Sequence, residues 1–219
     1  MSRAVLLTRW VASSFVLATM LMLCAGRVNG ALTAYLLIFA GMGLAIALVT
    51  DSSQGKERRK PGPAEIHPGS RVAASLLFLA TVLVAALDAG RFHWTQPASE
   101  TTQDFALALL MLAAVLQVWA MAVNPFFSTA IRIQPERRHE LVTSGPYSFV
   151  RHPGYLAMTI IMPATALTLG SVIALIPALS YSVLILHRTV SEDLFLTEEL
   201  RGYVGYATAV PFRLIPGIW

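Results

Sequence analysis

The chain has 219 residues, of which 56% are hydrophobic and only 13% are charged, and its formal net charge is +4. A soluble domain carries roughly a quarter charged residues, so this chain has too few polar side chains to cover a globule in water. Composition therefore excludes an ordinary soluble protein and favours an integral membrane protein.

Five runs without a charged residue mark the predicted membrane helices. A helix needs about 20 apolar residues to cross a hydrocarbon core near 30 Å. The last run is too long for one crossing and contains Pro163, Gly170 and Pro177, so it predicts a hairpin of two helices that turns near Gly170. The runs are residues 10–26, 28–50, 72–87, 105–131 and 153–186.

These runs predict an all-α fold, a polytopic transmembrane bundle of six helices with a helical hairpin near the C-terminus. The number is five if the hairpin is shallow or if the first run is not a membrane helix. Arg3 and Arg9 before the first run are also typical of a signal peptide, which is the alternative for this segment.

Basic residues predict the orientation of the bundle, because Lys and Arg are enriched in cytoplasmic loops. The 51–71 loop is rich in them, whereas the 88–104 loop carries only Arg91 beside three acidic residues. With alternating crossings, both termini and every basic segment lie on the cytoplasmic side of the membrane, which we expect to be a bacterial inner membrane. Anionic lipid headgroups then explain the basic residues, and no nucleic-acid partner is expected.

Two polar segments, residues 124–155 and 187–219, flank the predicted hairpin, which brings their ends together at the inner membrane surface. In the first, Pro153 suits the first turn of a helix, which places Arg151 and His152 at a helix N-terminus that favours an anionic group. Tyr147 and Tyr155 offer flat faces to an adenine ring or a cation. An interfacial loop anchored by Arg and Tyr would have a similar composition.

In the second segment, Arg188 and Glu192 are four residues apart and share one helix face. An intrahelical salt bridge is one interpretation, although Arg before Glu is the weaker order. Charges that emerge directly from a long apolar run are costly unless they face a cavity or each other, which favours a functional pair. His139, His152 and His187 do not have the spacing of a metal site, and none is predicted.

Four strings in this order resemble the isoprenylcysteine carboxyl methyltransferases and related membrane phospholipid methyltransferases. They are residues 139–147, residues 151–155, Arg188 with Glu192 and Asp193, and the tail 202–216. The resemblance covers residues 105–219 and implies a methyltransferase core there, whereas residues 1–104 are N-terminal transmembrane helices with no motif and look like a variable addition.

The resemblance further implies S-adenosylmethionine as cofactor, bound between the two polar segments, and a lipophilic substrate that reaches the site from the bilayer. Glu192 would hold the cofactor's ammonium group and act with Arg188, which would bind the substrate beside the transferred methyl group. Asp193 stands where the family usually has a second Glu. The implied cofactor-binding residues are Gln134, His139, Glu140, Leu141, Val142, Gly145, Tyr147, Arg151, His152, Pro153, Gly154, Tyr155, Glu192 and Asp193.

Methyl transfer from a sulfonium is an in-line displacement that needs positioning more than acid–base catalysis. A carboxylate acceptor is ionised at pH 7 and needs no base, whereas an amine would need one, with Glu192 the only nearby candidate. A prenylated cysteine, a phospholipid amine, or another lipophilic acid, thiol or amine all remain possible substrates. The alternatives are an NADPH-dependent membrane sterol reductase, whose tails look like residues 210–219, and a membrane protein that is not an enzyme.

Overall fold

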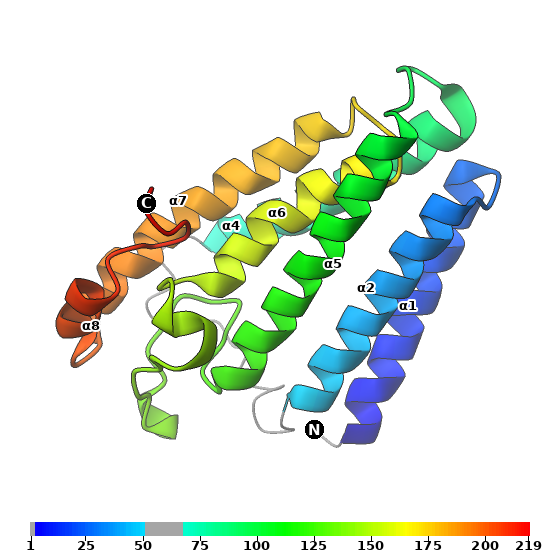
Figure 1. Cartoon of the computed structure of the whole chain (residues 1–219). Helices are drawn as coiled ribbons and strands as arrows, with labels where there is room; N and C mark the ends of the chain where they lie inside the picture. The colour runs from blue at the N-terminus through cyan, green and yellow to red at the C-terminus, as the bar shows by residue number, and fades with distance from the viewer. Residues whose placement is uncertain (1–2, 51–67) are drawn as a thin grey trace.

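The structure is a computed structural model that describes residues 3–50 and 68–219, and within these residues it contains helices and connections but no strand. The predicted basic cluster of the 51–71 loop, Lys56, Arg58, Arg59 and Lys60, lies outside the described residues. Six long helices form one bundle (Figure 1). They are α1 (Arg3–Ala25), α2 (Gly30–Val49), α4 (Pro68–Leu87), α5 (Glu100–Val123), α6 (Pro153–Thr168) and α7 (Leu175–Glu199).

Short elements connect and cover these helices. A π-helical turn, η1 (Asp88–Phe92), extends α4, and two 3₁₀ turns, η2 (Pro135–Arg137) and η3 (Gly145–Ser148), lie in the connection between α5 and α6. A last helix, α8 (Tyr203–Ala209), follows α7. The predicted all-α bundle with a C-terminal hairpin is confirmed, and the hairpin turns at Gly170, whose φ of 85° is a left-handed conformation that suits glycine.

Four of the described helices are long and apolar enough to cross a membrane: Val5–Ala25, Gly30–Val49, Gly69–Phe92 and Glu100–Val123. The predicted count of five or six also includes the two hairpin helices, which do not meet these criteria. With 16 residues, α6 is about 24 Å long, less than the hydrocarbon thickness. Charged residues interrupt the apolar sequence of α7 at Arg188, Glu192 and Asp193.

The outer surface of the bundle is strongly apolar. Phe15, Leu37, Phe105 and Ile176 each expose about two thirds or more of their side chains, at 71%, 68%, 66% and 68%. Apolar patches of this extent are unfavourable in water but favourable against lipid chains. Together with the four long apolar helices, this surface identifies a multi-pass membrane protein.

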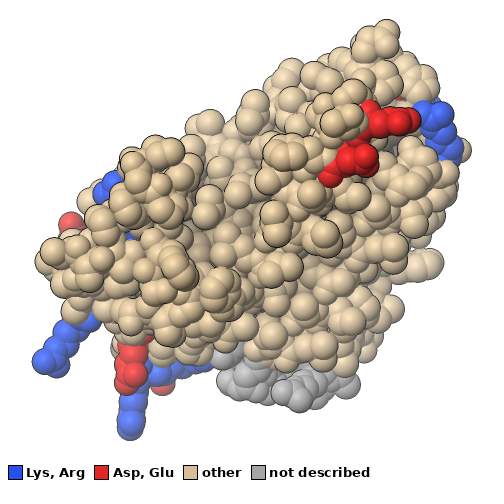
Figure 2. All heavy atoms as spheres, in the orientation of Figure 1, with Lys and Arg blue, Asp and Glu red and all other residues tan. Residues whose placement is uncertain are grey.

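The bundle has two chemically different ends (Figure 1). We call the end that carries residues 124–152 and 200–219 the polar end, and the opposite end, with the connections 26–29, 88–99 and 169–174, the far end. Most of the visible Lys and Arg side chains lie at the polar end, together with some acidic ones, whereas acidic side chains lie beside a smaller basic group at the far end (Figure 2). The chain alternates between the two ends from helix to helix, as the sequence predicted.

Close packing positions α6 and α7 against the rest of the bundle. Small buried residues on α5, such as Ala113 and Ala120, and on α6, such as Ala157 and Ala164, let these two helices approach closely. On its other side α6 packs against α7, which in turn packs along α4. This packing fixes the polar ends of α4, α6 and α7 around one space.

Candidate active site

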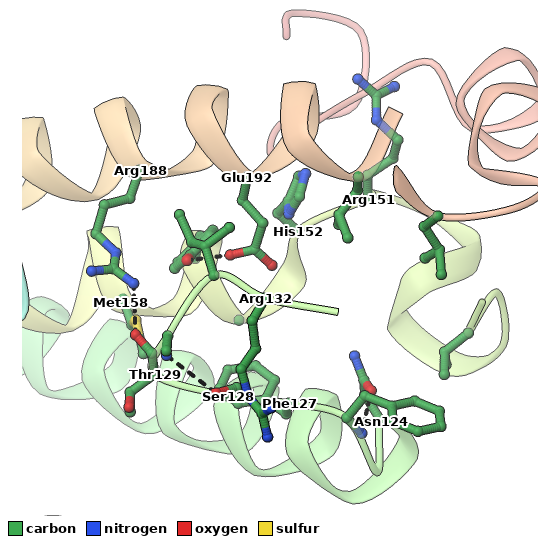
Figure 3. A pocket seen from close by; sticks show the side chains of 18 of the residues that line it. Asn124, Phe127, Ser128, Thr129, Arg132, Arg151, His152, Met158, Arg188 and Glu192 are labelled. Carbon is green, nitrogen blue, oxygen red and sulfur yellow. Dashed lines mark hydrogen bonds between the residues drawn. The ribbon is translucent and has the colours of Figure 1, made fainter. Parts of the chain in front are cut away.

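A cavity of about 340 Å³ lies at the polar end of the bundle. Its walls come from α4, α6, α7, α8 and the connection that follows α5. Figure 3 shows Arg188 and Glu192 projecting from the same side of α7 toward the connection that carries Asn124, Thr129 and Arg132. The shared face that the four-residue spacing predicted is therefore directed into a cavity.

Glu192 is held by the first turn of α6. The hydroxyl of Tyr155 donates a hydrogen bond to Oε2 of Glu192 at 2.5 Å, and the ring of Tyr155 stacks on that of His152 with centroids 5.9 Å apart. Pro153 occupies the first position of α6, where its missing N–H has no helical partner to lose. The hairpin thus brings the start of α6 beside the end of α7, as predicted.

Arg188 lies one turn before Glu192 and is only 6% exposed. Its Nη1 donates to Oγ of Ser70 at 2.5 Å and its Nη2 donates to the carbonyl oxygen of Thr129 at 2.7 Å. These two contacts hold the guanidinium at the cavity wall between α4 and the connection after α5. A buried guanidinium in such a position offers a carboxylate two parallel donors.

Asp193, next to Glu192 in sequence, points to a different part of the protein. Among the described residues it is not one of those that line the cavity. Its carboxylate is 4% exposed and accepts hydrogen bonds from Nε and Nη2 of Arg151 (2.8 and 3.0 Å), from His152 Nε2 (3.0 Å), from the hydroxyl of Tyr203 (2.7 Å) and from Nε of Arg213 (2.8 Å). These hydrogen bonds give Asp193 a structural role, because they hold together the segments that form this wall of the cavity.

Arg151 shares in this network. Its Nη1 also donates to the carbonyl oxygens of Val210 and Pro211, both at 2.8 Å. In Figure 3 its guanidinium points away from Glu192 and Arg188. Arg151 borders the cavity, but its guanidinium ties the C-terminal segment to α6 and α7. The Arg151 guanidinium is therefore engaged with Asp193 and with backbone carbonyls, and not with an anionic group at this helix N-terminus as the sequence suggested.

The connection after α5 forms the opposite wall. His139 stacks on Phe126, with ring centroids 4.3 Å apart, and its Nδ1 accepts a hydrogen bond from the backbone N–H of Gln134 at 3.3 Å. Burial and the nearby guanidinium groups of Arg137 and Arg132 lower the pKa of His139 to about 4. The ring is neutral at pH 7, and the hydrogen bond assigns its proton to Nε2.

The structure separates the predicted site residues into two groups. The first group borders the cavity, whereas Gln134, Gly145, Pro153 and Asp193 are not among its lining residues. Gln134 is 1% exposed and donates from Nε2 to the carbonyl oxygen of Phe126 at 2.8 Å, which supports the wall from behind. The lining residues are His139, Glu140, Leu141, Val142, Tyr147, Arg151, His152, Gly154, Tyr155, Arg188 and Glu192.

Gly154 has a close neighbour that explains its residue type. A Cβ at this position would lie 2.5 Å from Cε2 of Phe127, far inside van der Waals contact. Gly154 therefore lets the first turn of α6 approach the ring of Phe127, which lines the same cavity. The glycine of the predicted motif acts through this packing.

Sequence reasoning missed the contribution of α4. Arg71, Ala74 and Ser75 line the cavity, and Ser70 holds Arg188. Arg71 stands directly before the apolar run 72–87, at the end of the basic 51–71 segment, and that position indicates membrane orientation and not a cavity. In the part of the chain that the structure describes, no group of three or more His, Cys, Asp or Glu residues could hold a metal ion.

Fold and site thus define a helical membrane protein with a cavity at one end of its bundle that is lined by charged side chains. Residues 106–198 match the sequence model of the Isoprenylcysteine carboxyl methyltransferase (ICMT) family. The chain is also 31% identical over 114 residues to the Protein-S-isoprenylcysteine O-methyltransferase B of Arabidopsis thaliana, an alignment that covers 49% of this chain and 56% of that protein. The family match confirms the predicted resemblance over residues 106–198, and the chain spans about half the length of this curated relative.

Proposed function

We propose that this protein is an S-adenosylmethionine-dependent methyltransferase that acts on a lipophilic acceptor at the membrane. The observation that carries the proposal is the position of Arg188 and Glu192, which line one cavity from the same face of α7. Both residues lie inside the segment that matches the ICMT family. A cation and an anion on one cavity wall can bind a cofactor and a substrate of opposite local charge side by side.

The lining residues fit the chemical groups of S-adenosylmethionine. Glu192 presents a carboxylate suited to a positively charged sulfonium or ammonium group. Across the cavity, the 139–142 stretch offers the Nε2–H of His139 and the apolar side chains of Leu141 and Val142 to a purine. The volume of about 340 Å³ lies in the usual range for small-molecule sites. When bound, S-adenosylmethionine would supply an activated methyl group.

The protein's own residues would then orient the acceptor and exclude water. Arg188 is the buried cation that would hold a carboxylate beside the methyl group. A carboxylate is ionised near pH 7 and needs no general base, so positioning and desolvation are sufficient. The Tyr155 hydroxyl already occupies Oε2 of Glu192, which favours a binding role for Glu192 over that of a base.

The substrate and the location follow from the same features. The printed name of the Arabidopsis thaliana relative specifies an isoprenylcysteine, and we extend this only to a lipophilic acceptor such as a prenylated cysteine. We further propose that the polar end faces the cytoplasm, because the basic residues gather there. Single cysteines at exposed Arg138 and Glu100, introduced into a Cys24→Ala background, test this with a membrane-impermeant thiol reagent in intact cells. Only the cysteine at position 100 should react. If only the cysteine at position 138 reacted, the polar end would face away from the cytoplasm and the proposed orientation would be wrong.

Ligand-induced thermal stabilisation of the detergent-purified protein tests the cofactor. S-adenosylmethionine and its demethylated product should both raise the unfolding temperature, whereas NADPH should not. A response to NADPH alone would support the reductase alternative, and no response to any of the three would favour a protein that is not an enzyme.

A charge-neutral variant locates the cofactor within the cavity. Glu192→Gln should weaken S-adenosylmethionine binding about tenfold or more, because a charge-assisted contact is lost. Glu199→Gln is the matched control, since Glu199 is exposed on the same helix. Equal affinities in the two variants would remove Glu192 from the cofactor site.

A further inference from the structure

A glutamine is buried in the contact between α5 and α6. Gln117 is 4% exposed, and within residues 3–50 and 68–219 neither atom of its amide has a hydrogen-bond partner. Nearly every buried polar group of a folded protein has such a partner, so this amide needs an explanation. The neighbouring residues offer little, because the other buried residues of α5 are apolar: Ala106, Leu110, Ala113, Ala114 and Ala120.

The amide lies directly behind the wall of the candidate site. A Cβ at Gly154 would lie 3.8 Å from Nε2 of Gln117 and 2.5 Å from Cε2 of Phe127. Gly154 and Phe127 both line the cavity, and Figure 3 shows Phe127 on the wall opposite Glu192. Because Gly154 has no side chain, the ring of Phe127 covers the amide on the side of the cavity.

Along the bundle, this amide is at the depth of the proposed methyl transfer. Tyr155, the residue after Gly154, donates its hydrogen bond to Glu192. Arg188 lies one turn away from Glu192 on α7. The purine, by contrast, is proposed to lie against residues 139–142. A ligand group that meets Gln117 therefore belongs to the reacting end of the acceptor.

A carboxamide is suited to a particular kind of partner. It carries no net charge and offers both an acceptor oxygen and donor hydrogens, and a half-turn of the group exchanges the two. An uncharged amide of the ligand has the same two functions, and it loses its hydrogen bonds to water when it enters a buried wall. A charged group of the ligand is matched better by Arg188 or Glu192. Gln117 is therefore suited to an uncharged amide beside the reacting carboxylate.

On the basis of the proposed methyltransferase function, we propose that Gln117 binds an amide group of the acceptor once the ring of Phe127 has turned aside. The acceptor is then a lipophilic acid that is acylated on nitrogen next to its carboxyl group. Such an acceptor satisfies the buried amide of Gln117, whereas an acid without this group leaves it unpaired. A buried polar group that only one ligand can satisfy gives selectivity between the two ligands.

Two acceptors that differ in this group test the proposal in the full-length protein. They are an N-acetyl-S-alkyl-cysteine and the 3-(alkylthio)propionic acid with the same alkyl chain, which lacks the amide. Wild type should prefer the first in kcat/KM by about two- to tenfold, the range for one hydrogen bond. Gln117→Met, an apolar replacement of similar length, should remove this preference by lowering kcat/KM for the first acceptor alone.

Leu110→Met is the matched control, because Leu110 is 3% exposed and lies two turns earlier on the same face of α5. It should keep the wild-type preference. Equal use of the two acceptors by wild type, or an unchanged preference in Gln117→Met, would overturn the proposal even if methyl transfer is observed. Either result would mean that the amide is satisfied by water alone.

Thermal unfolding separates recognition from a structural role of Gln117. Methionine removes an unsatisfied polar group, so Gln117→Met should unfold at a temperature no lower than Leu110→Met does. A much lower unfolding temperature would show that the amide stabilises the fold, which contradicts the proposal. Loss of the stabilisation by S-adenosylmethionine in Gln117→Met would assign the amide to the cofactor and would contradict it as well.

A second variant removes the cover and keeps the amide. Phe127→Ala should retain or increase the preference for the acceptor that carries the amide, because Gln117 is then open to the cavity. If the preference disappeared in Phe127→Ala, it would belong to the aromatic ring and not to Gln117.

Failure of the proposed function has a different signature. If neither acceptor is methylated, the two are compared by how much they stabilise the protein against heat. A larger stabilisation by the acceptor with the amide, lost in Gln117→Met but not in Leu110→Met, would retain the role of Gln117 while the methyltransferase assignment fails. Equal stabilisation by both acceptors would overturn the role of Gln117 as well.

Discussion

Each end of the bundle contains a buried aspartate, and the two are satisfied in different ways. Asp193 at the polar end is 4% exposed and accepts hydrogen bonds from two guanidinium groups, an imidazole and a phenol. Asp88 at the far end is 1% exposed, and its hydrogen bonds come from Ser171 Oγ (2.6 Å), Thr95 Oγ1 (2.6 Å) and Thr95 N (2.9 Å). The Asp193 carboxylate is thus held mainly by positively charged guanidinium groups, whereas the Asp88 carboxylate is held by neutral donors.

The difference reflects what each end has to hold in place. At the far end the carboxylate joins the connection 88–99 to the hairpin turn, and neutral donors from two segments suffice. At the polar end it joins α6, α7, α8 and the C-terminal segment behind a cavity. Glu192 faces that cavity while the next residue, Asp193, fixes its surroundings, so one turn of α7 supplies both the proposed cofactor contact and support for the cavity wall. Substitutions at the polar end should therefore alter binding and stability, and those at the far end stability alone.

The largest expected effect comes from Asp193→Asn. The substitution leaves Arg151, which is 7% exposed, buried beside a neutral side chain. Breaking a buried ion pair in this way costs about 3–5 kcal/mol of folding free energy. We expect a large drop in the unfolding temperature in detergent and loss of S-adenosylmethionine binding. The exposed Glu198→Gln on the same helix is the control, and an unfolding temperature equal to that of the control would contradict the structural role of Asp193.

Arg188→Ala should separate catalysis from cofactor binding at the polar end. Loss of the buried guanidinium removes the charge-assisted contact to the acceptor, worth roughly 10- to 100-fold in kcat/KM. Affinity for S-adenosylmethionine should stay within about twofold of wild type by the usual tolerance of a non-contacting change. Arg188→Lys should restore only part of the activity, because Lys keeps the charge but not the two parallel donors. If both variants were fully active, Arg188 would have no role in substrate binding.

Asp88→Asn probes the far end with a smaller effect. The amide loses one acceptor oxygen for the hydroxyls of Thr95 and Ser171, at a cost of about 1–3 kcal/mol of folding free energy. The unfolding temperature should fall while S-adenosylmethionine affinity and kcat/KM are unchanged. Asp104→Asn, exposed near the same end, is the control. A change in cofactor affinity in Asp88→Asn would show that the two ends are coupled.

The last prediction concerns the pH dependence of stability at the polar end. The pKa of His139 is lowered to about 4 in the folded protein, from about 6.5 in an unfolded chain. Between these values the unfolded state binds more protons, so the folding free energy contributed by His139 falls as the pH decreases from 6.5 to 4. His139→Gln should show a weaker loss of thermal stability over this pH range than wild type. Equal pH profiles for the two proteins would mean that His139 is not buried as described.

The helices could be predicted from the sequence because their signals are local. The apolar runs indicated the six long helices, of which four are long and apolar enough to cross a membrane, and Gly170 in the last run indicated the hairpin turn. The four-residue spacing of Arg188 and Glu192 placed them on one helix face. For the candidate site, the family strings indicated the two polar segments, and most of the predicted residues line one cavity between them.

The same reasoning could not distinguish neighbouring residues within a motif. Gln134 and Asp193 have the residue types of ligand-binding positions, yet both are used to support the wall. The direction of a side chain depends on how its helix is rotated against its neighbours, which is a property of packing between distant segments.

By itself, the sequence determined the membrane class, the helical hairpin and the pair of charged residues that face a cavity, because composition, run length and helical spacing act within a few turns of chain. Only the tertiary structure decided that Asp193 turns away from the cavity and that α4 completes it. The contact between Arg188 and Ser70 joins residues 118 positions apart. No periodicity encodes such a contact, because it exists only after α4 has packed along α7.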